Sequence, residues 1–237
     1  MTAPLYKNTV LQRLDAASIQ RLELRPVELE LRHEMEHPGT TIDNIFFIEE
    51  GVASMTVTLK DGSQVEAGMF GYESVVGVSA LMGVRRSLNP VYMQVPGRGF
   101  ASPVDLARRE FQRFAEFHDL VLRYVQAQLT QSTQTAACNA KHDVEQRLAR
   151  WLLICKDRGN KPDFEISQEF MADMLGISRP SVSIAAGLLK QKGLIEYRRG
   201  AILILDEKRL GERACECYQV VREHLTNFAE FDTGFVV

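Results

Sequence analysis

A segment in the C-terminal third of the chain constrains the fold more than any other. Residues 165–205 read EISQEFMADMLGISRPSVSIAAGLLKQKGLIEYRRGAILIL. Apolar side chains recur at helical spacing on both sides of Gly176, a residue type that tolerates the left-handed conformation in which helices end. Ser167 and Ser178 are good N-caps, because a serine hydroxyl can accept a hydrogen bond from a free amide at a helix start. The segment therefore predicts a helix-turn-helix followed by a β-hairpin with strands at 194–198 and 201–205, the wing.

The second of these helices has the character of a DNA-recognition helix. Its expected buried face consists of Val182, Ala185, Leu188 and Leu189. The other face, at the N-terminal end, presents Arg179, Ser181 and Ser183. From Gly176 to Arg209 there are seven basic and three acidic residues, a balance of +4, whereas the whole chain carries -3. A basic module in an acidic chain favours contact with DNA phosphates over the alternative of two helices packed in an ordinary α-helical domain.

Composition places the chain among ordinary globular proteins. It has 237 residues, 45% hydrophobic and 25% charged, so we expect one or two domains. No apolar run has the length of a membrane span, and the N-terminal segment lacks the apolar core of a secretory signal. We therefore expect a cytoplasmic protein without a membrane partner.

The sequence shows no pattern typical of an enzyme or a metal centre. We find no Walker loop and no nucleophile–base pair. The four cysteines form no CxxC pair and no Cys/His cluster of zinc spacing; they are Cys138, Cys155, Cys215 and Cys217. We therefore predict reduced structural thiols, no metal site and no catalytic residues.

The N-terminal half indicates a β domain. Residues 9–24 read as one short amphipathic helix. From Val27 to about Val95 the hydrophobic period is two, with turn signals such as KDGS at 60–63 between short apolar runs. This pattern predicts an antiparallel β roll of the jelly-roll type over residues 1–111. Combined with the helices that follow, it gives an α+β fold.

Helical periodicity returns after Pro103 and carries two apolar stripes. One stripe consists of Phe117, Leu120, Val121 and Tyr124, and the other of Leu122, Val125 and Leu129. Two stripes require two covering surfaces: the chain's own β domain and, most simply, the same helix of a second copy. The alternative is a long helix buried within one subunit. We predict a dimerisation helix over 112–138, with Leu120 and Tyr124 in its seam. A hinge at 139–142 then opens the winged-helix domain over 139–237.

The order of β roll, long helix, hinge and winged helix resembles the Crp–Fnr family of bacterial transcription regulators. The motifs that carry the resemblance are IDNIFFIEEGVASMTV, GMFGYES, DVEQRLARWLL and ISQEFMADMLGISRPSVSIAAGLLKQKGLI. They span almost the whole chain, and the last is the most specific. The resemblance implies a homodimer that binds a two-fold symmetric site on double-stranded DNA. It also implies a β roll that senses an effector or serves as a dimer scaffold, and a contact with RNA polymerase.

The resemblance assigns DNA contacts to the recognition helix and the wing. Arg179 matches the family's arginine at the helix start, where a guanidinium can contact guanine. The other candidates are Ser178, Ser181, Ser183 and the wing residues Arg198 and Arg199, which we expect on backbone phosphate. Pro180 and Ile184 replace residues that read bases in many members, so the half-site of the catabolite activator type is not expected here.

The resemblance also implies an effector pocket in the roll. Gly71, Glu73, Arg86 and Ser87 match the residues that hold the ribose and phosphate of a cyclic nucleotide, and Ser132 and Thr133 align with base-contacting positions. Tyr72, Leu88 and a longer connecting loop depart from that pattern. The effector therefore stays open: a cyclic nucleotide, another ligand or none. The absence of an N-terminal cysteine cluster argues against iron–sulfur sensing.

Two readings of function compete. The first is a homodimeric, sequence-specific transcriptional regulator. The second is a cytoplasmic nucleotide-binding or protein-interaction module whose winged helix does not bind DNA; the absence of a basic DNA-facing surface would favour it.

Overall fold

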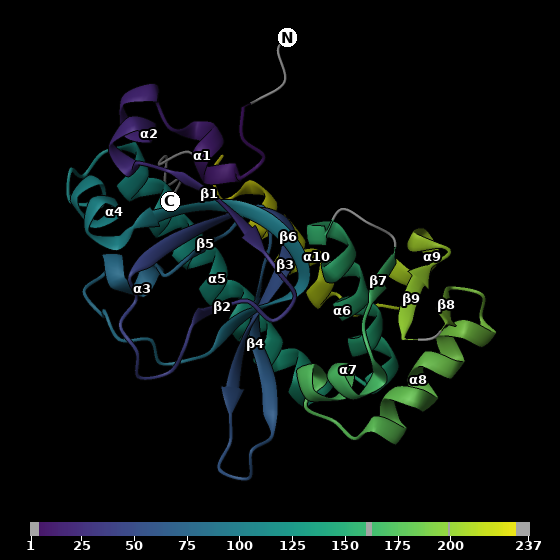
Figure 1. The fold of residues 1–237 in the computed structure, drawn as a ribbon. Coiled ribbons are helices and arrows are strands. Elements are labelled where there is room, and N and C mark those ends of the chain that lie inside the picture. The colour runs from purple at the N-terminus through teal and green to yellow at the C-terminus, as the bar shows by residue number, and fades with distance from the viewer. Residues whose placement is uncertain (1–4, 160–162, 199, 231–237) are drawn as a thin grey trace.

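The computed structural model describes residues 5–159, 163–198 and 200–230. A β roll with short helices at its base is followed by one long helix and a C-terminal winged helix (Figure 1). The predicted α+β class, with an N-terminal roll and a C-terminal winged helix, is confirmed. No helix of the described ranges is both long enough and apolar enough to cross a membrane.

The roll is an antiparallel sheet built mainly from two long, bent strands. The strands are β1 (Arg25–Leu29), β2 (Glu34–Glu36), β3 (Asn44–Thr58), β4 (Gln64–Phe70), β5 (Val75–Val76) and β6 (Val91–Pro103). Their order is β1-β6-β3-β4, with β2 paired to β6 and β5 to β3. The register between β3 and β6 shifts at Glu50 and Val52, and such bulges bend a sheet toward closure. Phe47, Ile48 and Met93 lie wholly buried inside the roll.

Four short helices close the base of the roll. They are α1 (Thr9–Arg13), α2 (Ala16–Leu22), α3 (Val78–Leu81) and α4 (Val104–Phe111). The single helix predicted over 9–24 is wrong, because the chain breaks between α1 and α2. Leu14 is extended there, and the Asp15 carboxylate accepts a hydrogen bond from the Ser18 amide at 2.6 Å, which starts a new helix.

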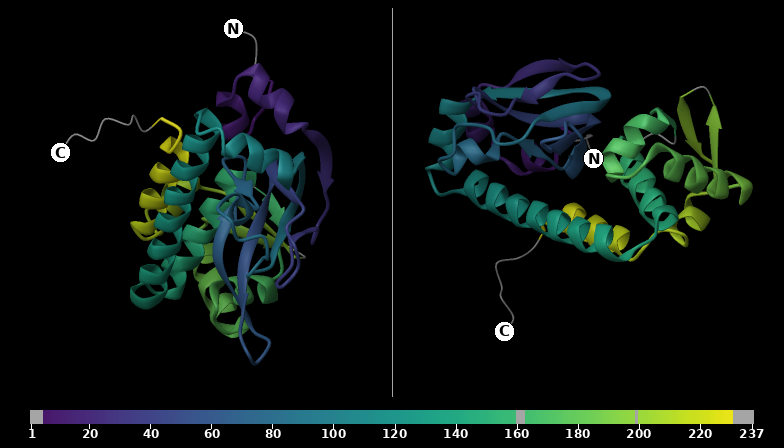
Figure 2. Two further views of the ribbon diagram at one scale, coloured as in Figure 1. Left: turned by 90° about the vertical axis from the view of Figure 1, so that its left-hand side faces the viewer. Right: turned by 90° about the horizontal axis from the view of Figure 1, so that it is seen from below.

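The long helix α5 (Glu116–Lys141) runs along the roll, and α10 (Cys217–Asn227) lies beside it (Figure 2). The rings of Tyr124 and Phe228 meet edge to face, with their centroids 5.6 Å apart. Leu120 and Tyr124 are fully buried within this chain, whereas Leu122 and Leu129 are 42% and 56% exposed. The prediction that Leu120 and Tyr124 face a partner is therefore wrong, and the other apolar stripe is the uncovered one.

The winged-helix part begins directly after α5. Residues predicted as a hinge mostly belong to α5, which ends at Lys141, so only His142 and Asp143 separate it from α6 (Val144–Gly159). The remaining elements are β7 (Asp163–Glu165), α7 (Gln168–Leu175), α8 (Arg179–Gln191), β8 (Ile195–Arg198), β9 (Ala201–Ile204) and α9 (Glu207–Gly211). Strand β7 pairs with β9 and adds a third strand to the predicted hairpin.

Candidate functional site

The helix-turn-helix forms where local sequence signals place it. The Ser167 hydroxyl accepts the Phe170 amide at 3.1 Å and starts α7. Gly176 ends that helix with a φ of +61°, which lets its amide bond back to α7 carbonyls. A Cβ at this glycine would lie 3.0 Å from the Val65 side chain, so the turn packs against the β3–β4 hairpin of the roll.

Helix α8 is capped at its start and packs against the domain through apolar side chains. Ser178 accepts the Ser181 amide at 3.4 Å, and Pro180 lies in the first turn, where its missing N–H costs little. The buried residues of the helix are Val182, Ala185, Ala186 and Leu189. Leu188, which we predicted to be buried, is 40% exposed. Its side chain therefore adds to the surface that α8 presents.

Helix α8 lies on the side of the winged-helix part that is away from the roll, with α7 between them (Figure 1). Arg179 is exposed and makes no hydrogen bond or ion pair with any described residue, and Ile184 is 66% exposed. The serines are partly engaged already. The Ser183 hydroxyl donates to the Gln168 side chain, and the hydroxyls of Ser178 and Ser181 lie 2.9 Å apart. Arg179 is therefore the side chain best placed to enter a groove.

The wing carries exposed basic charge at its tip. The side chain of Arg198 is 78% exposed and pairs with Glu196 at 2.9 Å. An ion pair at a solvent-exposed position contributes little to stability, so Glu196 holds Arg198 only weakly. Arg199, the other wing residue predicted to meet phosphate, lies outside the described residues. Gly200 has a φ of +87°, which suits the tight turn between β8 and β9.

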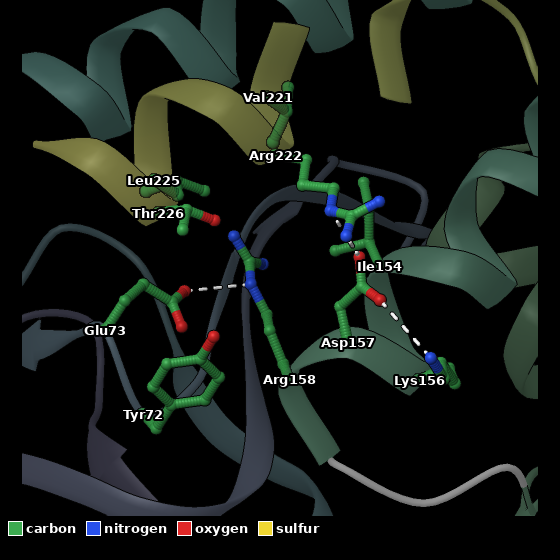
Figure 3. Close-up of a pocket in the computed structure, with 10 residues that line it drawn as sticks. All are labelled: Tyr72, Glu73, Ile154, Lys156, Asp157, Arg158, Val221, Arg222, Leu225 and Thr226. Carbon is green, nitrogen blue, oxygen red and sulfur yellow. Dashed lines mark ion pairs between the residues drawn. The ribbon is translucent and has the colours of Figure 1, made fainter. Parts of the chain in front are cut away.

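The loop between β4 and β5 of the roll, residues 71–74, contacts an arginine from the winged-helix part. We call this loop the sensor loop, because the family resemblance places effector-binding residues in it. Arg158, in the last turn of α6, places its Nε atom 2.8 Å from the Glu73 carboxylate, and both side chains are only 5% exposed (Figure 3). The same guanidinium donates to the Gln131 side chain on α5 at 2.7 Å. Glu73 also accepts the Gly71 amide at 3.3 Å. We call this set, Glu73, Gln131 and Arg158, the arginine latch.

Gly71 allows the latch to close. A Cβ at Gly71 would lie 2.6 Å from the Cβ of Arg158, closer than side-chain atoms approach in real proteins. The glycine that the family resemblance assigns to an effector phosphate therefore serves here for close approach of α6. Sequence reasoning missed Arg158, because no local motif connects it to a loop of the other domain.

The structure does not gather all predicted effector residues around Glu73. Ser87 is buried and donates to Glu36 of β2 at 2.7 Å. Arg86 is exposed, and its backbone forms an isolated β-bridge with Thr41. Thr133 is exposed and bonds only to carbonyls of its own helix, and Ser132 donates to Ala67 at 3.4 Å. No hydrogen bond or ion pair among the described residues connects any of these four to Glu73.

A cavity of about 290 Å³ lies beside the latch, between the sensor loop, α6 and α10 (Figure 3). Its polar wall includes Tyr72, Glu73, Asp157 and Arg222. Asp157 lies 3.9 Å from the Arg222 guanidinium and accepts the Tyr218 hydroxyl at 2.7 Å. The charged groups of this wall are therefore already paired within the chain.

A second contact fixes the winged-helix part to the roll. The indole of Trp151 on α6 donates to the Glu66 carboxylate of β4 at 3.1 Å, and Ser54 donates to the same carboxylate at 2.6 Å. Burial disfavours the charged form and raises the pKa of Glu66 to about 7. A fraction of Glu66 is therefore neutral at physiological pH, which lowers the cost of enclosing it between the domains.

Comparison with known proteins agrees with this architecture. Residues 146–213 match the family model of the Crp-like helix-turn-helix domain. A global nitrogen regulator of Synechococcus elongatus is 21% identical over 217 residues, which cover 87% of this chain and 97% of the relative. A CRP-like cAMP-activated global transcriptional regulator of Mycobacterium tuberculosis is 24% identical over 221 residues, which cover 89% of this chain and 98% of the relative.

Solved structures show the same fold. A protein of the Crp/Fnr family from Eubacterium rectale aligns with a TM-score of 0.69 at 15% identity, covering 87% of this chain and 98% of that one. FixK2 from Bradyrhizobium japonicum aligns with a TM-score of 0.68 at 13% identity, covering 81% and 98%. A β roll joined to a Crp-like helix-turn-helix is the architecture of a DNA-binding transcription regulator. Residues 146–213 are a Crp-like helix-turn-helix domain, and over most of its length the chain is similar to transcription regulators of the Crp–Fnr family.

Proposed function

We propose that the chain is a homodimeric regulator that reads a two-fold symmetric DNA site through the exposed face of α8. The observation that carries this proposal is the exposed Arg179 at the start of α8, which pairs with none of the described residues and lies in the same domain as a basic wing. In a two-fold dimer, two such helices enter successive major grooves about 34 Å apart. Such a regulator acts in the cytoplasm, on the bacterial chromosome, and contacts RNA polymerase at its promoters.

Arg179 and Arg198 are assigned different roles. A guanidinium at the start of a recognition helix can make two hydrogen bonds to guanine, and losing one base contact costs about 1–3 kcal/mol at one position of the site. Removing a wing arginine that contacts phosphate lowers the affinity for all DNA sequences alike. The slope of log affinity against log salt concentration then falls by about one unit. Ile184 is exposed on the same helix and offers apolar contact to a thymine methyl.

Duplexes selected from random or genomic DNA test this assignment. We expect Arg179→Ala to flatten the preferred motif, and Arg198→Ala to keep the motif while lowering the salt dependence of binding. Arg25→Ala, an exposed arginine on β1 of the roll, is the matched control and should change neither. If Arg179→Ala lowers the affinity for specific and scrambled duplexes equally, Arg179 contacts phosphate and does not read a base.

The dimer seam is proposed to lie on the uncovered face of α5. Leu122, Gln126, Leu129 and Thr133 are all exposed and follow the alternating spacing of four and three residues found in paired helices. We expect the double variant Leu122→Glu/Leu129→Glu to sediment as a folded monomer. Leu88→Glu, on a loop of the roll where the leucine is 78% exposed, should stay dimeric. A dimeric double variant would place the seam elsewhere.

The roll is proposed to regulate DNA binding through the arginine latch. A ligand that binds Glu73 must displace the Arg158 guanidinium, which already supplies the charge that this carboxylate needs. Because Ser87 is bonded to Glu36 and Glu73 is already paired with Arg158, we expect calorimetry to show no tight binding of cyclic AMP or cyclic GMP. A micromolar heat signal that Arg86→Ala abolishes would contradict this expectation and assign the roll to cyclic nucleotides.

A further inference from the structure

Four side chains with metal-ligating atoms converge where α5 ends and α10 begins. Cys138 lies in the last turn of α5, and His142 caps that helix. Cys215 and Cys217 lie on either side of Glu216, the N-cap of α10. Their three sulfurs and one ring nitrogen all lie within 4.8 Å of one another. Spacing along the sequence predicted no Cys/His cluster. The cluster forms because α10 returns along α5 and brings its first residues to the end of that helix.

The distances suit a tetrahedral metal ion. The sulfurs of Cys138 and Cys215 are 3.5 Å apart, and the Cys217 sulfur is 3.6 Å from Nδ1 of His142. Zinc bonds of about 2.3 Å to sulfur and about 2.0 Å to nitrogen place tetrahedral ligand atoms about 3.8 Å apart for two sulfurs and about 3.5 Å apart for sulfur and nitrogen. These two distances match that geometry to within about 0.3 Å, and the other pairs of ligand atoms lie within 4.8 Å of one another.

The surroundings orient the ligands and favour thiolates. Nε2 of His142 lies 3.2 Å from the Glu216 carboxylate, which leaves Nδ1 directed toward the sulfurs. Metal-bound histidines commonly donate their other ring N–H to a carboxylate in this way. The Gln134 amide donates to the Cys217 sulfur at 3.2 Å. An N–H donor of this kind stabilises thiolate sulfur.

We propose that Cys138, His142, Cys215 and Cys217 bind one Zn²⁺ ion in a closed structural site. Three thiolates and one imidazole form a donor set that zinc prefers, and four protein ligands leave no open position for catalysis. The three cysteines are at most 4% exposed, and the His142 side chain is 17% exposed, so the sulfur side of the site is shielded from solvent. On binding, the thiols release their protons to solvent and their sulfurs bind the metal.

The proposed ion would link the dimerisation helix to the C-terminal helix of the DNA-binding part. Two of its ligands lie at the end of α5 and its cap, and two lie at the start of α10. A metal that binds only the folded arrangement stabilises that arrangement. Metal loading therefore fixes α10 against α5 next to the two-residue link to α6.

Metal analysis and cobalt titration of the full chain test the site. We expect one zinc per chain after purification under reducing conditions. After chelation and return of Co²⁺ alone, we expect the strong visible absorption and thiolate-to-cobalt charge transfer of a tetrahedral site. Cys138→Ala and Cys217→Ala should lose both signals, and His142→Ala should shift the cobalt spectrum. Cys155→Ala is the control, because Cys155 is equally buried but lies on α6 outside the cluster.

Several results would overturn the site. The titration of the reduced wild-type chain needs no variant, so a misfolded variant cannot hide a negative answer. A wild-type chain that gives no tetrahedral cobalt spectrum, or a Cys155→Ala variant that loses as much metal as Cys138→Ala, would refute it. Stoichiometric iron with sulfide, or a Cys138–Cys215 disulfide in the freshly isolated chain, would show that the sulfurs serve another chemistry.

Discussion

Replacing Arg158 by methionine tests the arginine latch most directly. The substitution keeps the length of an apolar stem but removes the guanidinium, so the Glu73 carboxylate, 5% exposed, loses its charge partner. Breaking a buried pair by removing one partner costs about 3–5 kcal/mol, because the remaining charge stays desolvated. Glu73 keeps its bond from the Gly71 amide, and we therefore expect the lower end of that range, about 3 kcal/mol.

A double-mutant cycle separates the pair from its surroundings. Glu73→Gln alone leaves Arg158 buried with Gln131 as its remaining acceptor, and should cost a similar amount. In Glu73→Gln/Arg158→Met no charge is left unpaired, so the total should fall short of the sum of the single variants by about 2–3 kcal/mol. That shortfall is the coupling energy of the pair.

The chain contains one tryptophan, and its position makes the assay specific. Trp151 lies in the contact between α6 and the roll, so its fluorescence reports undocking, whereas circular dichroism reports loss of helices and strands. We expect urea titrations of Arg158→Met to show the fluorescence change before the dichroism change. A cost below about 1 kcal/mol, or single-variant costs that simply add, would show that Glu73 and Arg158 do not form a buried pair in solution.

Three further substitutions have outcomes fixed by the structure. The folded-state pKa of Glu66, about 7, lies above its ordinary 4.5, so the carboxyl contributes stability below pH 4.5 that is lost as the pH rises through 7. Glu66→Gln should therefore raise the melting temperature relative to wild type at pH 8 but not at pH 5. The corresponding gain in the free energy of unfolding is at most about 3 kcal/mol. Gly71→Ala should undock α6 and change the Trp151 fluorescence as Arg158→Met does, because the added methyl meets Arg158 at 2.6 Å. Gly187→Ala, with open space around it in the middle of α8, should stabilise the chain by about 0.5–1 kcal/mol in denaturant titrations, and a simultaneous loss of DNA affinity would show close approach of DNA at that position.

Features with local causes could be predicted from the sequence. Ser167, Gly176 and Ser178 start and end helices through hydrogen bonds and backbone preferences within a few residues, and the structure has all three in those roles. The rotation of α8 about its axis could not be predicted in the same way. Leu188 and Leu189 are neighbours, so either can face inward, and packing against α6 buries Leu189 together with Ala186.

Features made by distant segments needed the fold. Glu73 and Arg158 lie on different domains, and nothing in either local sequence indicates that they pair. The Cys/His cluster carried a weaker signal that the spacing rules missed. Cys138 and His142 are four residues apart at the end of a helix, which places them on one face, and Cys215 and Cys217 belong to the turn that starts α10. Only the return of α10 along α5 shows that the two pairs meet.

The Arg158 contact and the Cys/His cluster both restrain the orientation of the winged-helix part relative to α5. Arg158 ties the end of α6 to the roll and, through Gln131, to the middle of α5. The Cys/His cluster ties the end of α5 to the start of α10, on the other side of the two-residue link at 142–143. In a dimer paired along α5, the orientation of the winged-helix part relative to that helix sets the separation of the two recognition helices, and hence the half-site spacing that the dimer fits. If the docked orientation is the one that fits DNA, a ligand that breaks the Arg158 contact lowers DNA affinity, and a metal that secures the Cys/His cluster raises it. The sign of the Arg158→Met effect on DNA affinity decides which orientation fits DNA.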